Sequence, residues 1–331
     1  MKAEKKTEIE GIILFQGVKR MKESRYLHIS GSDGLELSVF RTEPDNANEI
    51  KGIVQLVHGM NEYKERYIPF IKFLTENGFL CVIHDHRGHG ASVKSSDDLG
   101  YMYEAGYEAL IEDTHEITLE IKAYAKELTG RDNLPFILFG HSMGSMVVRC
   151  YIRKYDADID KLIVCGCPSA QSGMKPGLAL IKIVSKIKGE HTRSKFISDL
   201  VMGSYEKRYK KEEVPHMWVN SDPEKVKKYN DDPLCNYTFT LNGYLNLVKL
   251  TILTYTDGGY AMNKPDLPIR FFSGEDDPCA VSQKAFNQAM ELLKKQGYKD
   301  VDGIMYPNLR HEILNEDAKD MVYEDMLNFI K

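Results

Sequence analysis

The chain has 331 residues, 42% of them hydrophobic and 28% charged, and a formal net charge of −5. This is the composition of an ordinary globular protein, and the slightly acidic balance offers no basic field for nucleic acid, which we exclude as a partner. A chain of this length can form two domains or one α/β domain with an insertion.

The N-terminal segment and the cysteines indicate the compartment. The apolar run at residues 12–15 is too short for a signal peptide, and no run reaches the ~18 apolar residues of a membrane-spanning helix. The six cysteines are scattered, and Cys165 and Cys167 lack the second pair that a zinc site needs. We therefore expect a cytoplasmic protein with reduced thiols.

Predicted strands and helices alternate along most of the chain. The first two strands, at 26–30 and 36–41, flank a turn rich in Gly and Ser, so we expect them to pair antiparallel at a sheet edge. Six more apolar, β-branched runs lie at 53–57, 80–84, 136–139, 162–165, 269–272 and 303–306. Helical spacing of apolar residues occurs at 65–76, 107–128, 144–155, 282–294 and 316–330. This pattern predicts an α/β fold with a mostly parallel, eight-stranded sheet flanked by helices.

The alternation stops between residues 168 and 264, where amphipathic helices rich in Lys, Met and Tyr follow one another. We predict a core at 1–167 and 265–331 and an inserted helical cap at 168–264. The cap segment 175–195 carries basic side chains around an apolar face. It is either a helix that makes transient contact with a membrane surface or an ordinary cap helix facing a pocket.

The residues after the strand at 136–139 carry the strongest chemical signal. They read Gly140-His-Ser142-Met-Gly144 and lead into a helix, which is the strand–turn–helix setting of a nucleophile elbow. Both glycines are needed because a Cβ in so tight a turn would collide with the neighbouring strand or helix. Ser142 is therefore the predicted nucleophile.

A carboxylate and a histidine follow in the chain order that this motif requires. The loop after residues 269–272 offers three acids, of which we choose Asp277, with Asp276 as the second choice and Glu275 as the third. The loop after the last strand holds His311, the predicted general base. A solvated acidic turn is the alternative explanation of the first loop.

The tetrahedral intermediate of acyl transfer needs two backbone N–H donors. One should come from Met143, directly after the nucleophile, and the other from Met60, in the loop after the strand at 53–57. These two amides form the predicted oxyanion hole.

The stretch VIHDHRGHGAS at 82–92 contains three histidines and suggests a metal site. Asp85 precedes His86, however, and Arg87 follows it, which puts a cation where a metal would bind. We predict instead that Asp85 pairs with Arg87 and that the stretch braces the oxyanion loop. No metal and no cofactor are expected.

Four segments together resemble the α/β-hydrolases of the monoacylglycerol lipase and lysophospholipase group, of the serine aminopeptidase S33 type. They are HGMNEYKERY from His58, DHRGHGAS from Asp85, GHSMGS from Gly140 and RHEILNE from Arg310. The resemblance implies the same triad and oxyanion amides, an ester or lipid as the small-molecule substrate, and a capped hydrolase fold. The cap segment 232–244 also resembles lysophospholipases.

Residues for substrate binding are chosen by their position near these motifs. Asn61 and Glu62 follow Met60, although Glu62 is also placed to pair locally with Arg66. Apolar and aromatic cap residues suit an adaptable acyl pocket or simply the core of the cap. They are Leu178, Ile181, Met202, Met217, Trp218, Phe239, Tyr244 and Leu245, with Phe239 and Tyr244 preferred.

Three other functions remain open. Proline iminopeptidases share the fold and triad but need acidic groups in the cap, whose first half is basic here. A short-chain or aryl carboxylesterase is a further alternative. A binding protein on a hydrolase scaffold is disfavoured because all three triad residues are present. The oligomeric state is not indicated by any pattern.

Overall fold

The computed structural model describes residues 21–170 and 173–331, so the apolar run at 12–15 lies outside the described part. The strands are β1 (Met21–Ile29), β2 (Glu36–Pro44), β3 (Gly52–Val57), β4 (Phe79–His84), β5 (Phe136–His141), β6 (Lys161–Cys165), β7 (Ile269–Gly274) and β8 (Val301–Tyr306). The α-helices are α1 (Ile68–Glu76), α2 (Gly106–Thr129), α3 (Met143–Tyr155), α4 (Met174–Lys188), α5 (Lys195–Arg208), α6 (Pro223–Asp231), α7 (Leu241–Thr254), α8 (Gln283–Gln296) and α9 (Lys319–Ile330).

The described strands form one eight-stranded sheet in the order β1-β2-β4-β3-β5-β6-β7-β8. Strands β1 and β2 pair antiparallel, as do β2 and β4, and every other pairing is parallel. The predicted α/β-hydrolase fold and the antiparallel hairpin at the sheet edge are therefore confirmed.

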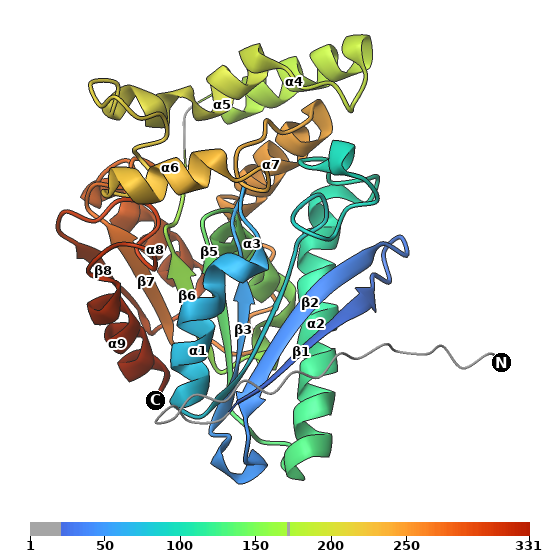
Figure 1. Ribbon diagram of the computed structural model, residues 1–331, viewed down its shortest axis with the longest axis vertical. Helices are drawn as coiled ribbons and strands as arrows, with labels where there is room; N and C mark the ends of the chain where they lie inside the picture. The colour runs from blue at the N-terminus through green and yellow to red at the C-terminus, as the bar shows by residue number, and fades with distance from the viewer. Residues whose placement is uncertain (1–20, 171–172) are drawn as a thin grey trace.

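The central strands are buried on both faces, which explains their continuous apolar sequences. Every residue of β3, β4 and β5 is buried. One face packs on α1 and α9 through a cluster that includes Phe70 and Tyr323. The other face packs on α2, α3 and α8 through a second cluster, and Figure 1 shows the twisted sheet between these layers.

Two predicted helices begin later than expected. The first turn of the helix predicted at 65–76 is a 3₁₀ turn at Lys64–Tyr67, and α1 proper begins at Ile68, where Pro69 fits the first turn. Helix α9 begins at Lys319 rather than 316, and the Glu316 carboxylate lies in the loop before it. It accepts hydrogen bonds from the Ser221 amide at 3.0 Å and the Arg310 amide at 3.0 Å.

Helices α4, α5, α6 and α7 lie between β6 and β7 in the chain, within residues 168–264, which we call the cap. Figure 1 shows them beyond the carboxyl ends of the parallel strands. Helix α7 contacts both α2 and α3, and α4 packs on α7. Ligands of open α/β sheets bind at this carboxyl edge, so the cap encloses the expected site. Among the described helices, none is long and apolar enough to cross a membrane.

Candidate active site

Ser142 lies in the sharp turn between β5 and α3. Its backbone has φ 52° and ψ −117°, a strained conformation for a residue with a Cβ. Such strain persists only where the surroundings impose it. A Cβ on Gly140 would lie 2.4 Å from the Gly144 carbonyl oxygen, and one on Gly144 would lie 2.1 Å from the Val57 carbonyl oxygen. The turn thus holds the hydroxyl of Ser142 above the edge of the sheet.

His311 bridges Ser142 and Asp277, which come from the loops after β8, β5 and β7. Its Nε2 lies 2.8 Å from Ser142 Oγ, and its Nδ1 lies 2.9 Å from Asp277 Oδ2. Asp277 also accepts a hydrogen bond from the Cys279 amide at 2.8 Å. His311 and Asp277 are both buried. The three predicted triad residues therefore form one continuous hydrogen-bonded chain.

The other two acids of the β7 loop do not reach His311. Asp276 points outward and pairs with the Arg208 guanidinium at 3.0 Å. Glu275 is exposed. Of the three predicted candidates, Asp277 is therefore the acid that contacts the His311 imidazole, and Asp276 and Glu275 do not.

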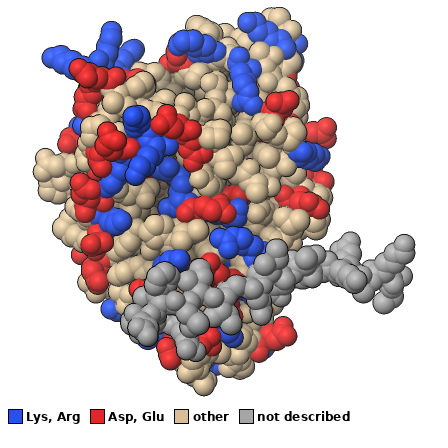
Figure 2. Space-filling view, in the orientation of Figure 1, with Lys and Arg blue, Asp and Glu red and all other residues tan. Residues whose placement is uncertain are grey.

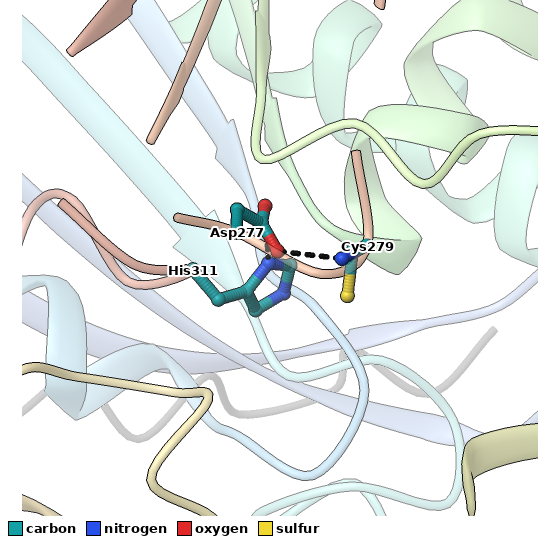
Figure 3. Close-up of side chains that lie close together, drawn as sticks. All are labelled: Asp277, Cys279 and His311. Atoms are coloured by element: carbon teal, nitrogen blue, oxygen red, sulfur yellow. Dashed lines mark hydrogen bonds and ion pairs between the residues drawn. The ribbon is translucent and has the colours of Figure 1, made fainter. Parts of the chain in front are cut away.

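Figure 3 shows Cys279 beside Asp277 and His311, an arrangement that also resembles a metal site. One donor atom from each residue lies within 4.8 Å of the others, the one such group among the described residues. Burial and the charge of Asp277 raise the pKa of the Cys279 thiol well above its usual value. A metal would need the thiolate and would compete with His311 for the carboxylate, so the donor set fits a hydrogen-bonded triad better.

The loop after β3 lies against the nucleophile. A Cβ on Gly59 would lie 2.9 Å from the Cβ of Ser142, so only glycine permits this approach. Met60 and Met143 both border the cavity beside Ser142. Met143 is the first residue of α3, where amide groups have no acceptor within the helix. Both residues of the predicted oxyanion hole thus line the cavity that Ser142 lines.

A cavity of about 630 Å³ opens beside Ser142 and His311, within the range of small-molecule sites. Its floor is formed by the core and its walls by the cap. Apolar side chains from α3, α4, α5 and α7 line it: Met146, Leu180, Ile181, Met202, Leu247 and Val248. None of the described lining residues is Lys or Arg.

The family described as "Serine aminopeptidase, S33" matches residues 48–318 of the chain. The chain belongs to this family. A monoacylglycerol lipase of Mycolicibacterium smegmatis is 24% identical over 283 residues, which are 85% of this chain and 88% of that protein.

Solved structures of an esterase and a monoglyceride lipase share the fold. A highly thermostable carboxyl esterase from Bacillus coagulans, in complex with glycerol, has a TM-score of 0.82 at 26% identity, over 93% of this chain and 97% of that one. A soluble variant of the monoglyceride lipase from Saccharomyces cerevisiae has a TM-score of 0.65 at 18% identity, over 100% of this chain and 97% of that one. At that identity the likeness shows the fold alone.

Four of the eight cap residues suggested for the pocket of this S33 hydrolase line the cavity. They are Ile181, Met202, Trp218 and Tyr244. The remaining four, Leu178, Met217, Phe239 and Leu245, do not. The prediction for Phe239 is therefore wrong. Its ring is fully buried between His89 and Tyr244, with centroids at 5.3 and 5.7 Å, because it fills the junction of cap and core.

Asn61 and Glu62 line the cavity, but their polar atoms already have protein partners. The Asn61 amide group donates to the carbonyl oxygens of Cys235 at 3.0 Å and Tyr237 at 2.6 Å, both in the cap. Glu62 accepts hydrogen bonds from the Gly59 amide and, at 2.9 Å, from a tyrosine hydroxyl. Asn61 thus fastens the cap to the oxyanion loop.

Glu62 also forms a buried ion pair with His141, which the sequence patterns did not single out. Its Oε1 lies 2.8 Å from His141 Nδ1, and His141 Nε2 donates to the His311 carbonyl oxygen at 3.2 Å. Burial alone would raise the pKa of Glu62, but the charge and hydrogen bond of His141 lower it to about 2. Burial alone would lower the pKa of His141, but the charge and hydrogen bond of Glu62 raise it above its usual value. The pair joins the oxyanion loop, the nucleophile turn and the His311 loop.

The predicted pairing of Glu62 with Arg66 is wrong. The Arg66 guanidinium instead binds both oxygens of Glu312, at 2.6 and 2.5 Å, directly after His311. Arg66 lies in the 3₁₀ turn and pairs with Glu312 of the loop after β8, while Glu62, before that turn, pairs with His141. The spacing of Glu62 and Arg66 in the sequence therefore predicts the wrong partner for each residue.

The predicted pair of Asp85 with Arg87 is also wrong. Asp85 binds the Lys64 ammonium at 2.6 Å, and Arg87 binds Asp113 of α2 at 2.9 Å and Asp33 at 2.7 Å. The turn at Gly88 and Gly90, both with positive φ, sends the two side chains to opposite sides.

The histidines of this stretch lie against the oxyanion loop. The His86 amide donates to His58 Nε2 at 2.9 Å, and the two rings are tilted by 52° with their centroids 4.4 Å apart. Burial lowers the pKa of His84 to about 3 and that of His89 to about 4, so both are neutral. The predicted bracing of the oxyanion loop by residues 82–92 requires a contact between the two, and the His86–His58 hydrogen bond is such a contact.

Proposed function

We propose that this protein is a serine hydrolase that cleaves carboxylic esters of lipid-like acyl groups, with a monoacylglycerol as the best-fitting substrate. The chain is a carboxylic ester hydrolase of the lipase and esterase type by family and relatives. The observation that carries the serine mechanism is the hydrogen-bonded chain from Ser142 through His311 to Asp277, at the mouth of an apolar cavity.

In the proposed reaction, Ser142 Oγ attacks the ester carbonyl carbon while His311 Nε2 accepts its proton. Asp277 holds the imidazole in the tautomer with Nδ1 protonated and stabilises its charged form. The amides of Met60 and Met143 bind the oxyanion. The imidazolium then protonates the leaving alcohol, and a water molecule repeats the sequence on the acyl-enzyme.

The absence of cations in the described cavity wall favours a neutral headgroup. A phosphate in a lysophospholipid is normally bound by Arg or Lys. The polar wall residues include Ser198, Asn236 and Thr238, which suit hydroxyl groups. Glycerol esters therefore fit the wall better than lysophospholipids do.

A second candidate function, an aminopeptidase, is favoured by one observation. The wall contains Asp199 and Glu206 of α5, acids that can bind a substrate amine, although the outside of the cap is basic. Both are already engaged, Asp199 with Lys195 at 2.8 Å and Glu206 with the Trp218 ring nitrogen at 2.8 Å. We rank ester hydrolysis first for this reason.

A basic and apolar surface on the cap supports contact with an anionic lipid surface. Four large apolar side chains of α4 and α5 are exposed: Ile183 (57%), Ile187 (77%), Phe196 (63%) and Leu200 (52%). Exposed lysines flank them, at positions 182, 186, 188 and 195. Figure 2 shows basic side chains projecting from the end of the molecule that holds α4 and α5 in Figure 1. Leu200 also borders the cavity, so a lipid leaving the membrane would meet the entrance directly.

A hydrolysis panel tests the function. We expect faster turnover of a monoacylglycerol than of the lysophospholipid with the same acyl chain, a short aryl ester or proline p-nitroanilide. Ser142→Ala should abolish both hydrolysis and labelling by a fluorophosphonate. Preferred release of a phospho-headgroup would overturn the substrate choice, and faster cleavage of the anilide would establish the aminopeptidase.

Vesicle flotation tests the cap surface separately. We expect the double variant Ile187→Ser/Phe196→Ser to lose binding to vesicles rich in anionic lipid. The matched control is Leu27→Ser/Ile29→Ser, which removes two side chains of β1 that are each 52% exposed. Equal loss in both variants would count against docking through the cap.

A further inference from the structure

Two aromatic rings pack on the imidazole of His311, one from the core and one from the cap. The His141 ring lies 4.8 Å away and the Trp218 ring 5.1 Å away, measured between ring centroids. Both rings are tilted against the imidazole, by 46° and 50°. Hydrogen bonds at the two imidazole nitrogens set where Nε2 points, and packing against the ring limits how far it can turn. Trp218, which is 8% exposed, is thus a cap residue whose side chain contacts the predicted general base.

The backbone of His311 is held by the same part of the cap. Four consecutive carbonyl oxygens of the cap, at residues 217–220, accept hydrogen bonds from the loop that carries His311. The His311 amide donates to the Trp218 carbonyl oxygen at 3.3 Å, and the next amide of the loop donates to the Val219 carbonyl oxygen at 2.8 Å. The Arg310 guanidinium donates to the two outer carbonyl oxygens. The loop of the general base is therefore fastened to the cap on both sides of His311.

The indole ring of Trp218 is itself fixed within the cap. Its Nε1 donates a hydrogen bond to Glu206 Oε1 at 2.8 Å, and its ring lies 5.3 Å from the Tyr205 ring between centroids. Both of these partners lie on α5. The Glu206 carboxylate also accepts a hydrogen bond from the His216 amide at 3.3 Å, two residues before Trp218. The position of the indole is therefore set by contacts that do not depend on a bound substrate.

We propose that Trp218 is a positioning residue for the general base. Its carbonyl oxygen holds the backbone of His311, and its indole ring limits the rotation of the imidazole, so that Nε2 stays directed at Ser142. This inference rests on the proposed serine mechanism, in which His311 accepts the proton of Ser142. A misplacement of about 1 Å between reacting groups can cost ~10²-fold in rate, so the loss of such a contact is measurable.

The competing role of Trp218 is that of a wall residue, because its side chain also lines the cavity. A residue that only contacts the acyl chain changes the KM of long-chain substrates and leaves the reaction of Ser142 with small reagents unchanged. A positioning residue instead changes every acylation of Ser142, whatever the size of the acyl group. A small reagent that needs the Ser142–His311 pair but no long-chain pocket therefore separates the two roles.

The first test is the rate of inactivation by diisopropyl fluorophosphate. Ser142 Oγ forms a bond to phosphorus, His311 accepts the proton, and fluoride leaves with the electron pair of the P–F bond. We expect Trp218→Leu, which keeps an apolar side chain without a ring, to slow inactivation by about tenfold to ~100-fold. The kcat for p-nitrophenyl acetate should fall by a similar factor. Trp218→Phe restores a ring and should recover most of the rate, to within about fivefold of the wild type.

The second test is a double-mutant cycle between Trp218 and His311. If Trp218 acts through the imidazole, Trp218→Leu should change the residual hydrolysis of p-nitrophenyl acetate by less than about twofold once His311→Ala is present. An equal loss in both backgrounds would show that Trp218 acts on the substrate or on the fold, and overturns the proposal. An unchanged inactivation rate in Trp218→Leu, with a higher KM for a long-chain monoacylglycerol, also overturns it.

Glu206→Ala carries the test if Trp218→Leu does not fold. Its side chain is 43% exposed, and the substitution removes the acceptor of the indole N–H. We expect inactivation to slow by about fivefold, the equivalent of one hydrogen bond, and only while His311 is present. An unchanged rate overturns the proposal. A wild-type chain that hydrolyses esters but resists the reagent refutes the proposed serine mechanism instead, so the two failures are distinguishable.

Discussion

Replacing Glu62 with Gln tests the inference that a buried ion pair, rather than a contact with substrate, is the role of this residue. The substitution preserves the shape of the side chain but removes the charge that His141 requires. It also replaces one acceptor oxygen by an amide group, next to the Gly59 amide and the Tyr67 hydroxyl that both bind Glu62 Oε1. The change therefore acts on the oxyanion loop and the nucleophile turn together.

The expected magnitude follows from burial. The side chains of Glu62 and His141 are 4% and 5% exposed, so water cannot replace the missing charge. Removing one partner of a buried pair costs about 3–5 kcal/mol. At about 2 °C per kcal/mol for a chain of this size, Tm should fall by roughly 6–10 °C. Displacement of the Met60 amide should lower kcat by up to ~10²-fold, the cost of losing one oxyanion donor.

The assay compares kcat, KM and Tm of Glu62→Gln with those of Glu65→Gln. Glu65 lies in the adjacent 3₁₀ turn, is 37% exposed and pairs with Lys64 at 3.1 Å, so its loss should cost less than about 0.5 kcal/mol. A positioning role predicts that kcat falls while KM changes little. An increase in KM alone, with Tm unchanged, would refute the reasoning and indicate that Glu62 binds the substrate.

Three further predictions follow from the same contacts. Asp277→Asn should lower kcat by about 10⁴-fold by favouring the wrong imidazole tautomer, whereas Asp276→Asn should leave kcat within about twofold; comparable losses would show that the triad carboxylate is misassigned. Gly144→Ala should prevent stable folding, because its Cβ would lie 2.1 Å from a carbonyl oxygen. A Cβ on Gly177 in α4 would meet nothing within 4 Å, so Gly177→Ala should raise the free energy of unfolding by about 0.5–1 kcal/mol in chemical denaturation. The pKa of His141 is raised in the folded state, so the charged imidazole stabilises the fold fully below about pH 6.5. This stabilisation is lost as the pH rises through the folded pKa. The Tm of the wild type should therefore fall more steeply than that of His141→Gln between about pH 7 and 9. Parallel Tm profiles would contradict a charged His141.

The strands and the order of the reactive loops were predictable because they depend on local patterns. Strands β3, β4 and β5 are buried on both faces, so they appear as continuous apolar runs between turn residues. Ser142 is marked by two glycines that a tight turn requires, and the chain order of acid and base follows from the topology. The carboxyl ends of the parallel strands then bring those loops together.

Ion pairs were not predictable, because their partners come from elements that are distant in the sequence. Asp85 binds Lys64 and not its neighbour Arg87, whose partner Asp113 lies on α2. Spacing in the sequence says nothing about which side of a glycine turn each side chain takes. The prediction that Phe239 binds substrate is wrong for a related reason. An aromatic residue at the junction of cap and core has the same local sequence pattern as one in a cavity wall.

The hydrogen bonds of Asn61 make the position of the cap part of the catalytic geometry. Asn61, with φ 56°, directly follows Met60 and holds the cap carbonyls of Cys235 and Tyr237. Any movement that lifts residues 235–237 pulls on the residue next to the proposed oxyanion donor. If the cap opens to admit the substrate, that movement would misalign the proposed oxyanion hole, so closure over the acyl chain and readiness for attack would become one event. Esters that prevent closure would then bind without being turned over.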